Sequence, residues 1–276
     1  MYRFIIGSII IFSLLGIFIH GTGTSDLMVA LLSVASFLFG IFLAFAIANR
    51  QSRLNSIRTS LRKDDALLFS IYKLSACFGT ETQNKCRLLI DAFLINTIDC
   101  ELVDYDKSVN KFNELFDFFL GIEPKTDVQK IIYDNIIYAL KESTYNKKEL
   151  IHWLNEKMLG FEWGSLLILG SVILMSLFII NNNSAISVLI TVLLGTSLVL
   201  FLLILRELDN LSWKEGSWIW YPLAQLFIEL DLIPYIPKAI LDKKKISLKK
   251  GVAYRVVEYP NPYPDFSDKI IKIIKN

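Results

Sequence analysis

Residues 27–48 read LMVALLSVASFLFGIFLAFAIA and contain no charged side chain. An α-helix rises about 1.5 Å per residue, so this stretch is long enough to cross a hydrocarbon core of about 30 Å. The sequence therefore predicts a transmembrane helix at these positions. Three further blocks also lack charged side chains, and they run from Phe4 to Ile19, from Gly164 to Ile180 and from Ala185 to Leu205.

The first of these blocks is the shortest, and Met1 to Arg3 followed by an apolar run also resembles a signal peptide. Against cleavage, the residues from His20 to Ser25 contain no Ala-x-Ala site, and the next apolar block follows at once. We therefore expect the first block to be retained as a span. Hydrophobic residues make up 53% of the 276-residue chain and the mean hydropathy is positive, which is unusual for a water-soluble domain.

The chain is predicted to be an all-α integral membrane protein with four transmembrane helices in two hairpins and a helical domain between them. The first hairpin is residues 1–48, with spans at about 4–20 and 27–48, and the helical cytoplasmic domain is residues 49–162. The second hairpin is residues 163–205, with spans at about 163–180 and 185–205. Residues 206–276 are expected to form an interfacial helix and a short basic cytoplasmic tail.

The orientation follows from the placement of basic residues. The segments between the paired spans, His20 to Asp26 and Asn181 to Ser184, contain no Lys or Arg, whereas basic residues flank the other ends of the spans. The positive-inside rule then places both termini and the middle domain in the cytoplasm, and the composition favours the inner membrane of a bacterium. The residues behind this assignment are Arg50, Arg53, Arg58, Arg62, Lys63, Lys147, Lys148, Lys157 and Arg206.

The middle domain is predicted to contain about five helices. Ala48 to Phe78 has neither Gly nor Pro and carries apolar residues at helical spacing, so the second span is expected to continue into the cytoplasm as one long helix. Further helices are expected at about 85–103, 108–120, 127–141 and 147–159. Thr126 is a plausible helix start and Gly121 a helix stop.

The C-terminal segment combines aromatic residues with basic ones. Four aromatic residues between Trp213 and Tyr221, followed by alternating apolar residues, predict a helix on the inner membrane surface. The cluster Lys243, Lys244, Lys245, Lys249 and Lys250 fits binding of anionic lipid headgroups, and a solvated linker is an equally good interpretation. Val252 to Tyr259 is expected to form a short strand and Asp268 to Lys275 a brief amphipathic helix.

The sequence contains no recognisable catalytic or cofactor-binding motif. It has two histidines, His20 and His152, and three cysteines without ligand spacing, so neither a metal site nor a cofactor is expected. A net charge of +2 gives no reason to expect nucleic-acid binding. One interpretation of Glu207 and Asp209 is a cation site on the cytoplasmic side, and the favoured one is that they pair with Arg206 or face water. The spans also lack the ionisable residues that coupled transporters keep at membrane depth.

The second span has two distinctive faces. Ser36, Gly40 and Ala44 recur every four residues and form a narrow ridge that another helix can approach closely. One step around the helix stand the bulky residues Phe37, Ile41 and Phe45. Taken alone, such a bulky face more often meets lipid or another helix, and alternatively it forms an apolar ring in an oligomer.

The residues from Phe39 to Ala48, followed by Arg53, Arg58 and a helix to Ser75, resemble the bestrophin-like membrane proteins of bacteria. The likeness in layout covers most of residues 1–210. Bestrophins are pentameric anion channels with an apolar constriction on the second transmembrane helix, and the resemblance maps this constriction onto Phe37, Ile41 and Phe45. The dense acidic run that forms the calcium clasp of animal bestrophins is missing here.

Three classes of function follow. The first is a homo-oligomeric, anion-conducting channel in contact with membrane lipids, pentameric if the resemblance holds. The second is a membrane-anchored interaction or effector protein, whose helical domain binds a cytoplasmic protein partner and whose spans tether it to the bilayer or perturb it. An enzyme is the least favoured class, because no catalytic constellation is present.

Overall fold

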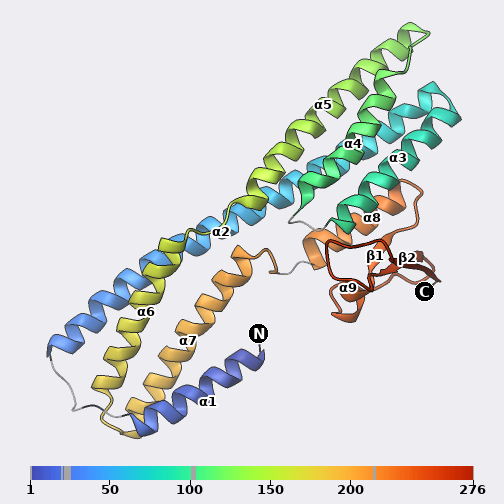
Figure 1. Ribbon diagram of the computed structural model, residues 1–276. Coiled ribbons are helices and arrows are strands. Elements are labelled where there is room, and N and C mark those ends of the chain that lie inside the picture. Colours follow the sequence, from blue (N-terminus) through green and yellow to red (C-terminus); the bar gives the residue numbers. More distant parts are fainter. Residues whose placement is uncertain (1, 20, 22–25, 101–103, 214–215, 276) are drawn as a thin grey trace. The chain divides into compact units, whose positions relative to one another are not determined.

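The computed structural model describes residues 2–19, 21, 26–100, 104–213 and 216–275, and helices dominate it (Figure 1). The chain forms two compact units. Unit 1 comprises Met1–Leu54 and Lys157–Trp213, and unit 2 comprises Asn55–Glu156 and Lys214–Asn276. The long helix α2, Asp26–Ser75, contributes its first part to unit 1 and its second part to unit 2. The predicted continuation of the second span into one long helix is therefore confirmed.

Unit 1 consists of four helices: α1 (Tyr2–Phe18), the first part of α2, α6 (Gly160–Ile180) and α7 (Ala185–Asp209). Among the described residues, three helical runs are long and apolar enough to cross a membrane. They are α2, the run that ends with α6, and α7. The apolar part of α1, Ile6–Phe18, is shorter than the other three.

Helix α1 packs against α7, its main neighbour among the described residues. The contact is close because α7 has a glycine there: a Cβ on Gly195 would lie only 3.0 Å from ring carbons of Phe12. Small residues permit such close approach between membrane helices. The predicted first hairpin, residues 1–48, stays a prediction as a topology, and most of the segment between its two spans, His20 and 22–25, lies outside the described residues.

The side chain of Asn181 joins the ends of three helices in unit 1. It is buried, its Nδ2 donates to the carbonyl oxygen of Gly16 at 2.7 Å, and its Oδ1 accepts from the Ser187 hydroxyl at 2.5 Å. Its backbone carbonyl accepts from the N–H of Gly21 at 3.0 Å. The short segment after α6 thus satisfies carbonyl groups at the end of α1, which have no partner inside their own helix.

Unit 2 contains the second part of α2, then α3 (Thr80–Asp99), α4 (Tyr105–Leu120) and α5 (Asp127–Asn155). The Thr126 side chain caps α5 by accepting from the N–H of Gln129 at 3.1 Å, as the sequence predicted. The predicted break between residues 141 and 147 is wrong, because α5 continues without interruption. The segment there contains no Gly or Pro, and Thr144 bonds back to the Leu140 carbonyl within the helix.

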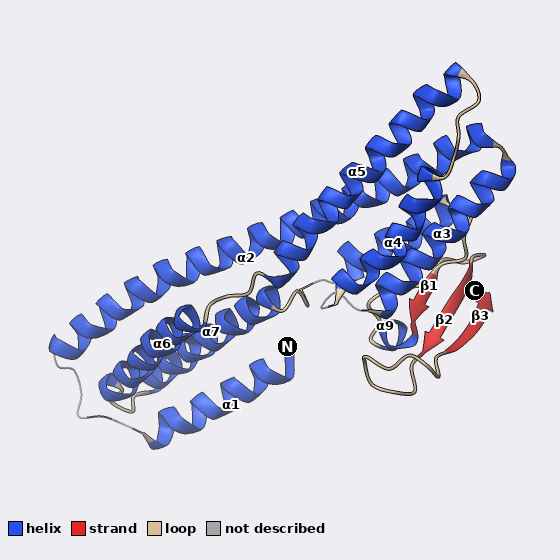
Figure 2. Ribbon diagram, turned by 45° about the horizontal axis from the view of Figure 1, so that its top comes forward, coloured by secondary structure: helices blue, strands red, loops and turns tan. Residues whose placement is uncertain are grey.

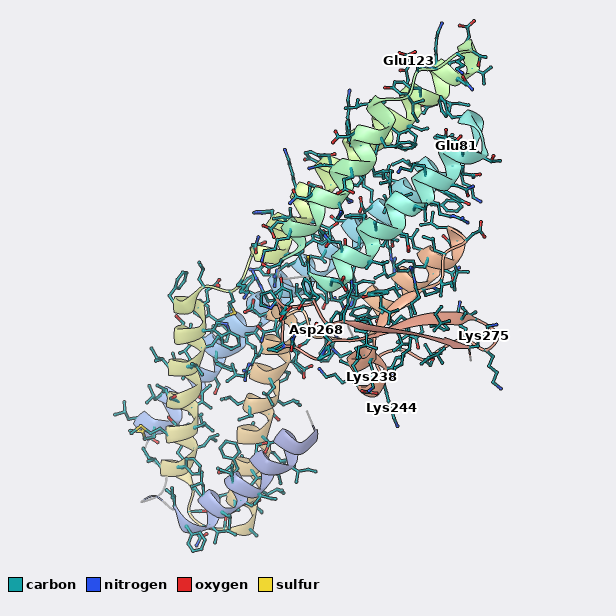
Figure 3. All side chains as sticks on the ribbon, turned by 45° about the vertical axis from the view of Figure 1, so that its right-hand side comes forward. Glu81, Glu123, Lys238, Lys244, Asp268 and Lys275 are labelled. Atoms are coloured by element: carbon teal, nitrogen blue, oxygen red, sulfur yellow. The ribbon has the colours of Figure 1, made fainter. Side chains whose placement is uncertain are left out.

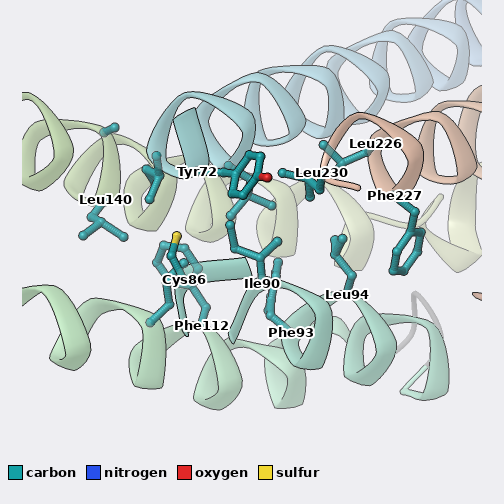
Figure 4. Packing of buried hydrophobic residues seen from close by; sticks show 14 of the residues in the cluster. Tyr72, Cys86, Ile90, Phe93, Leu94, Phe112, Leu140, Leu226, Phe227 and Leu230 are labelled. Atoms are coloured by element: carbon teal, nitrogen blue, oxygen red, sulfur yellow. The ribbon is translucent and has the colours of Figure 1, made fainter. Parts of the chain in front are cut away.

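The core of unit 2 is shown from close by in Figure 4. Phe93 and Phe112 meet edge to face, with ring centroids 5.6 Å apart, and apolar residues of α2 and α5 pack around them. Helix α8 (Tyr221–Glu229) adds Phe227 and the following Leu230 to this core. The sequence predicted that this helix lies on the membrane surface. That prediction is corrected, because its apolar residues are shielded from water by the core of the protein.

A small sheet completes unit 2. Strands β1 (Tyr235–Pro237), β2 (Ala253–Glu258) and β3 (Ile270–Lys275) lie in the order β1-β2-β3, the first pair parallel and the second antiparallel (Figure 2). Strand β2 confirms the predicted strand, whereas the predicted C-terminal helix is wrong because those residues pair with β2. The prediction of an all-α protein is corrected accordingly: the chain is mostly helical with one three-stranded sheet.

A buried lysine fixes α2 against α5. Lys147 is 1% exposed, and its ammonium group is paired with the Asp64 carboxylate and 3.2 Å from the Ser143 hydroxyl. The same nitrogen lies 4.4 Å from the ring centroid of Phe93 and 4.3 Å from that of Phe112. Burial lowers the pKa of Lys147, and the Asp64 carboxylate opposes this shift. A buried charge requires such a partner, so the network specifies how these helices align.

Candidate functional site on the second helix

In unit 1 one face of α2 is buried against the other helices. Ala35, Phe39 and Leu43 lie in one apolar cluster with residues of α6 and α7. The contact is tight at Gly170 of α6, where an added Cβ would lie 3.4 Å from Leu198 and 3.8 Å from the ring of Phe39. The spacing of four residues keeps these side chains on a single face of the helix. This face fixes the rotation of α2 within unit 1.

The predicted constriction residues lie on the other side of the same helix. Phe37, Ile41 and Phe45 are 67%, 39% and 67% exposed. Each residue turns an α-helix by about 100°, so Phe37 and Ile41 point roughly opposite to Ala35 and Phe39. The bulky face is therefore directed away from α6 and α7, and it is open in a single chain.

The predicted packing ridge is also open. Ser36, Gly40 and Ala44 are exposed, and among the described residues no atom lies within 4 Å of a Cβ built on Gly40. The ridge lies between the buried face and the bulky face on the circumference of α2. No helix of the described chain uses it for the close approach that the sequence predicted, so such a contact needs another molecule.

A buried charged cluster holds the end of α7 against α2. Arg53 donates to the backbone carbonyl of Asp209 at 2.8 Å, and Arg50 lies 3.5 Å from the Asp209 carboxylate. The same carboxylate accepts the N–H of Met158, just before α6, at 2.9 Å. Arginine at a helix C-terminus also interacts favourably with the helix dipole. The expectation that Asp209 pairs with Arg206 or faces water is thus wrong.

The basic residues proposed to bind lipid headgroups follow α9 (Lys238–Asp242) in unit 2. Lys243, Lys244, Lys249 and Lys250 are exposed and Lys245 is half-buried, and Figure 3 shows Lys244 projecting from the surface. The ammonium group of Lys249 donates to the side-chain oxygen of Gln225 at 3.1 Å. Within the described residues, no group of three or more His, Cys, Asp or Glu side chains is arranged to hold a metal ion.

One carboxylate of unit 2 has an unusual environment. Asp65 is half-buried on α2, and desolvation followed by repulsion from Asp64 raises the pKa of Asp65 to about 7. Glu229 adds to the shift, and Lys147 opposes it. The group therefore changes charge near neutral pH. Sequence reasoning could not find it, because its environment depends on residues from three separate helices.

A family model for the Bestrophin-like domain matches residues 6–211. The chain belongs to this family. The matched residues run from α1 to just beyond α7, so they include both open faces of α2 and the cluster around Asp209. Comparisons with curated proteins and with solved structures gave no match.

The sequence of this bestrophin-like protein marked two faces of α2 whose roles stay predictions, and it missed the contacts of Asn181 and Asp209 that join the helices of unit 1. The periodicity of small and bulky residues carried the first signal. The contacts of Asn181 and Asp209 have no such signal, because their partners lie 165 and 159 residues away along the chain. Asn181 is the first of three consecutive asparagines and Asp209 lies two residues after Glu207, so the sequence does not single out either residue.

Proposed function

We propose that this bestrophin-like protein is a homo-oligomeric ion channel that conducts anions. The bulky face of α2 would line the ion pathway in this assembly, with Phe37, Ile41 and Phe45 forming an apolar constriction. The observation that carries the proposal is that this face is open and points away from the helices on which α2 packs. Assembly around an axis would cover it, together with the ridge at Gly40.

The charge of α2 supports anions as the conducted species. Between Asp26 and Asp64 the helix contains no acidic residue and five basic ones. Basic residues along a pathway attract anions and repel cations. Two of the five, Arg50 and Arg53, lie 3.5 and 3.9 Å from the Asp209 carboxylate, so they are held in place beside the end of α7.

The proposed topology has four spans, namely α1 and the three helical runs that are long enough to cross a membrane. It places both termini and unit 2 in the cytoplasm of a bacterium. Single cysteines at Asn182 and Thr22, in a variant without the three native cysteines, should react with an impermeant thiol reagent in intact cells. Thr22 lies outside the described residues. Cysteines at Asp106 and Lys249 should be protected, and labelling of this second pair alone would overturn the topology.

Channel activity can be measured with purified full-length protein in liposomes of defined lipid composition. We expect chloride flux above that of empty liposomes, and a smaller flux of potassium. Cation flux greater than anion flux would contradict the selectivity. Persistent absence of any flux, in preparations where the protein is assembled and correctly inserted, would overturn the channel proposal.

The alternative function is a membrane-anchored interaction or effector protein, and the exposed apolar residues of unit 2 favour it. An isolated fragment of residues 50–160 is a poor probe, because Leu226, Phe227 and Leu230 complete the core of these helices. The full chain should instead be used to capture partners. Specific capture of one cytoplasmic protein by a chain that conducts no ions would support this alternative.

We also propose that the protein is not an enzyme and carries no bound cofactor. Lys147 is the most nucleophile-like buried amine among the described residues of unit 2, but aromatic rings and the Asp64 carboxylate enclose its nitrogen. A substrate would have to displace these groups to reach it. A chemical change in a cytoplasmic metabolite that depends on the purified protein would disprove this part of the proposal.

A further inference from the structure

A pocket of about 300 Å³ lies in unit 2 between α8 and the segment that follows α9. Pro222 and Ile228 of α8 and Ile246 of that segment give it apolar walls, and hydroxyl, amide and ammonium groups complete the lining. Small-molecule sites in proteins have volumes of about 300 to 1,000 Å³ and combine apolar walls with a few polar groups. The pocket thus has the size and the composition of a site for a small organic molecule.

The segment after α9 is fixed in place beside α8. A Cβ on Gly216 would overlap the carbonyl oxygen of Lys245, so the two parts of the chain come this close only because residue 216 has no side chain. The backbone N–H of Ser247 donates to the Tyr221 hydroxyl at 3.1 Å. These contacts hold the walls of the pocket in one arrangement.

The hydroxyl groups in the pocket have hydrogens left to donate. Tyr254 is 2% exposed, and its oxygen accepts the backbone N–H of Lys249 at 3.0 Å. A phenol also carries one hydrogen of its own, and among the described residues none accepts it from Tyr254. The hydroxyls of Tyr221 and Ser247 lie 3.0 Å apart and share one hydrogen bond, so one of their two hydrogens is left as well. The pocket therefore offers donors to a ligand.

Lys249 is the charged side chain among the described lining residues. Its ammonium group donates one hydrogen to the Gln225 side-chain oxygen at 3.1 Å and has two more. The Gln225 amide nitrogen donates to Glu229 at 3.1 Å, and Glu229 does not line the pocket. Gln225 thus orients the ammonium group. Positive charge and unused donors together favour a negatively charged ligand with several acceptor oxygens.

We propose that this pocket binds a small organic phosphate. The three phosphate oxygens would accept from Lys249, from Tyr254 and from the hydroxyl pair of Tyr221 and Ser247, and the organic part would lie against the apolar walls. Soluble phosphate esters and lipid headgroups share this chemistry. Of the five lysines predicted to bind headgroups, Lys249 alone lines the pocket. The inference does not depend on the proposed channel activity.

Binding of phenyl phosphate to the full chain in an uncharged detergent tests the site by calorimetry. We expect saturable binding of phenyl phosphate and none of phenol, which lacks the phosphate group. Lys249→Gln and Tyr254→Phe should each weaken binding by about tenfold or more, because each removes a donor to a charged oxygen. Phenol binding as tightly as phenyl phosphate would contradict recognition of the phosphate.

The matched control is Lys250→Gln, which removes a neighbouring positive charge that does not line the pocket. It should change the affinity less than twofold. Equal losses in Lys249→Gln and Lys250→Gln would show attraction by surface charge alone and overturn the site. Both lysines are exposed, so these two variants should fold, and they decide the question even when Tyr254→Phe is unstable.

Nanodiscs distinguish a lipid from a soluble ligand. The full chain is placed in discs that contain phosphatidic acid, a phosphate monoester, and in discs matched in net charge with phosphatidylglycerol, a phosphate diester. Weaker binding of phenyl phosphate in the first discs would identify a lipid headgroup as the occupant, and equal binding a soluble ester. No saturable binding in detergent or in either type of disc would overturn the proposal. Ion flux does not enter these measurements, so the pocket and the channel can fail separately.

Discussion

In unit 1, α2 exposes its bulky residues Phe37 and Phe45, whereas in unit 2 the same helix buries Leu68 and Ile71 completely in the core. Water drives apolar side chains inward, and the part of α2 in unit 2 follows this rule. The part in unit 1 does not, since lipid tails solvate apolar side chains as well as a protein interior does. The comparison teaches that one continuous helix passes between two environments.

Buried charge distinguishes the two regions in the same way. Unit 1 has a buried charged cluster beyond the charge-free part of α2 and at the end of α7, formed by Arg50, Arg53 and Asp209. Unit 2 places a lysine and an aspartate in the middle of its core, at Lys147 and Asp64. A charge at membrane depth is costly and has only protein groups as partners. The positions of the buried charges thus divide the molecule into the same two regions as the positions of the exposed apolar residues.

The largest effect is expected from breaking the buried pair of unit 2. Lys147→Ala leaves the Asp64 carboxylate buried without its partner, and we expect it to lower the free energy of unfolding of unit 2 by about 3 to 5 kcal/mol. Limited proteolysis of the full chain in detergent should show faster cleavage within residues 55–156. The neighbouring Lys148→Ala is the matched control, because its exposed side chain should change stability by about 0.5 kcal/mol or less.

The double variant Asp64→Leu with Lys147→Met sharpens this test. Removing both charges and keeping apolar volume should recover most of the lost stability, because no charge is then left unpaired. Equal protease resistance of Lys147→Ala and the native chain would show that the pair does not stabilise unit 2. Buried charge would then no longer distinguish unit 2 from unit 1.

A smaller effect, on conductance and not on folding, is expected from the open faces of α2. Replacing Phe37, Ile41 and Phe45 together with Ala should widen an apolar constriction that excludes water, and so raise basal anion flux severalfold with the assembly intact. Gly40→Leu should instead reduce assembly, because it fills the ridge. Unchanged flux of the triple variant, beside a conducting native protein, would contradict the assignment of the constriction.

The sequence predicted those elements whose signal is local. Charge-free blocks marked the apolar helices, the spacing of Ser36, Gly40 and Ala44 marked a ridge, and Thr126 marked the start of α5. The last strand was mistaken for a helix because IIKIIK repeats at every third residue, a period that fits neither structure well. Pairing with β2 decides its conformation, and this contact is not visible in the segment itself.

The residues that join the helices of unit 1 were missed for a related reason. Asp209 and Asn181 obtain their roles from partners that are far away in sequence, and no pattern of residue types along the chain reveals these pairs. The apolar residues of α8 illustrate the same limit, since an amphipathic segment fits a membrane surface and a protein core equally well. Only the placement of Phe227 against the helices of unit 2 distinguishes the two.

The smallest effect concerns Asp65, which should make the stability of unit 2 depend on pH. Its pKa in the folded protein, about 7, lies above the ordinary value of 3.8. Between these values the unfolded chain has already lost the proton that the folded chain keeps, so the contribution of Asp65 to stability falls as pH rises from about 4 to 7 and stays low above.

Asp65→Asn removes this dependence. We expect the variant and the native chain to melt at similar temperatures at pH 4, and the variant to melt a few degrees higher at pH 8, because the native carboxylate is then ionised beside Asp64 in a poorly hydrated site. Asp106→Asn, at an exposed carboxylate of α4, is the control and should give the same difference at both pH values. A variant that is less stable than the native chain at pH 8 would show that the ionised Asp65 has a favourable partner.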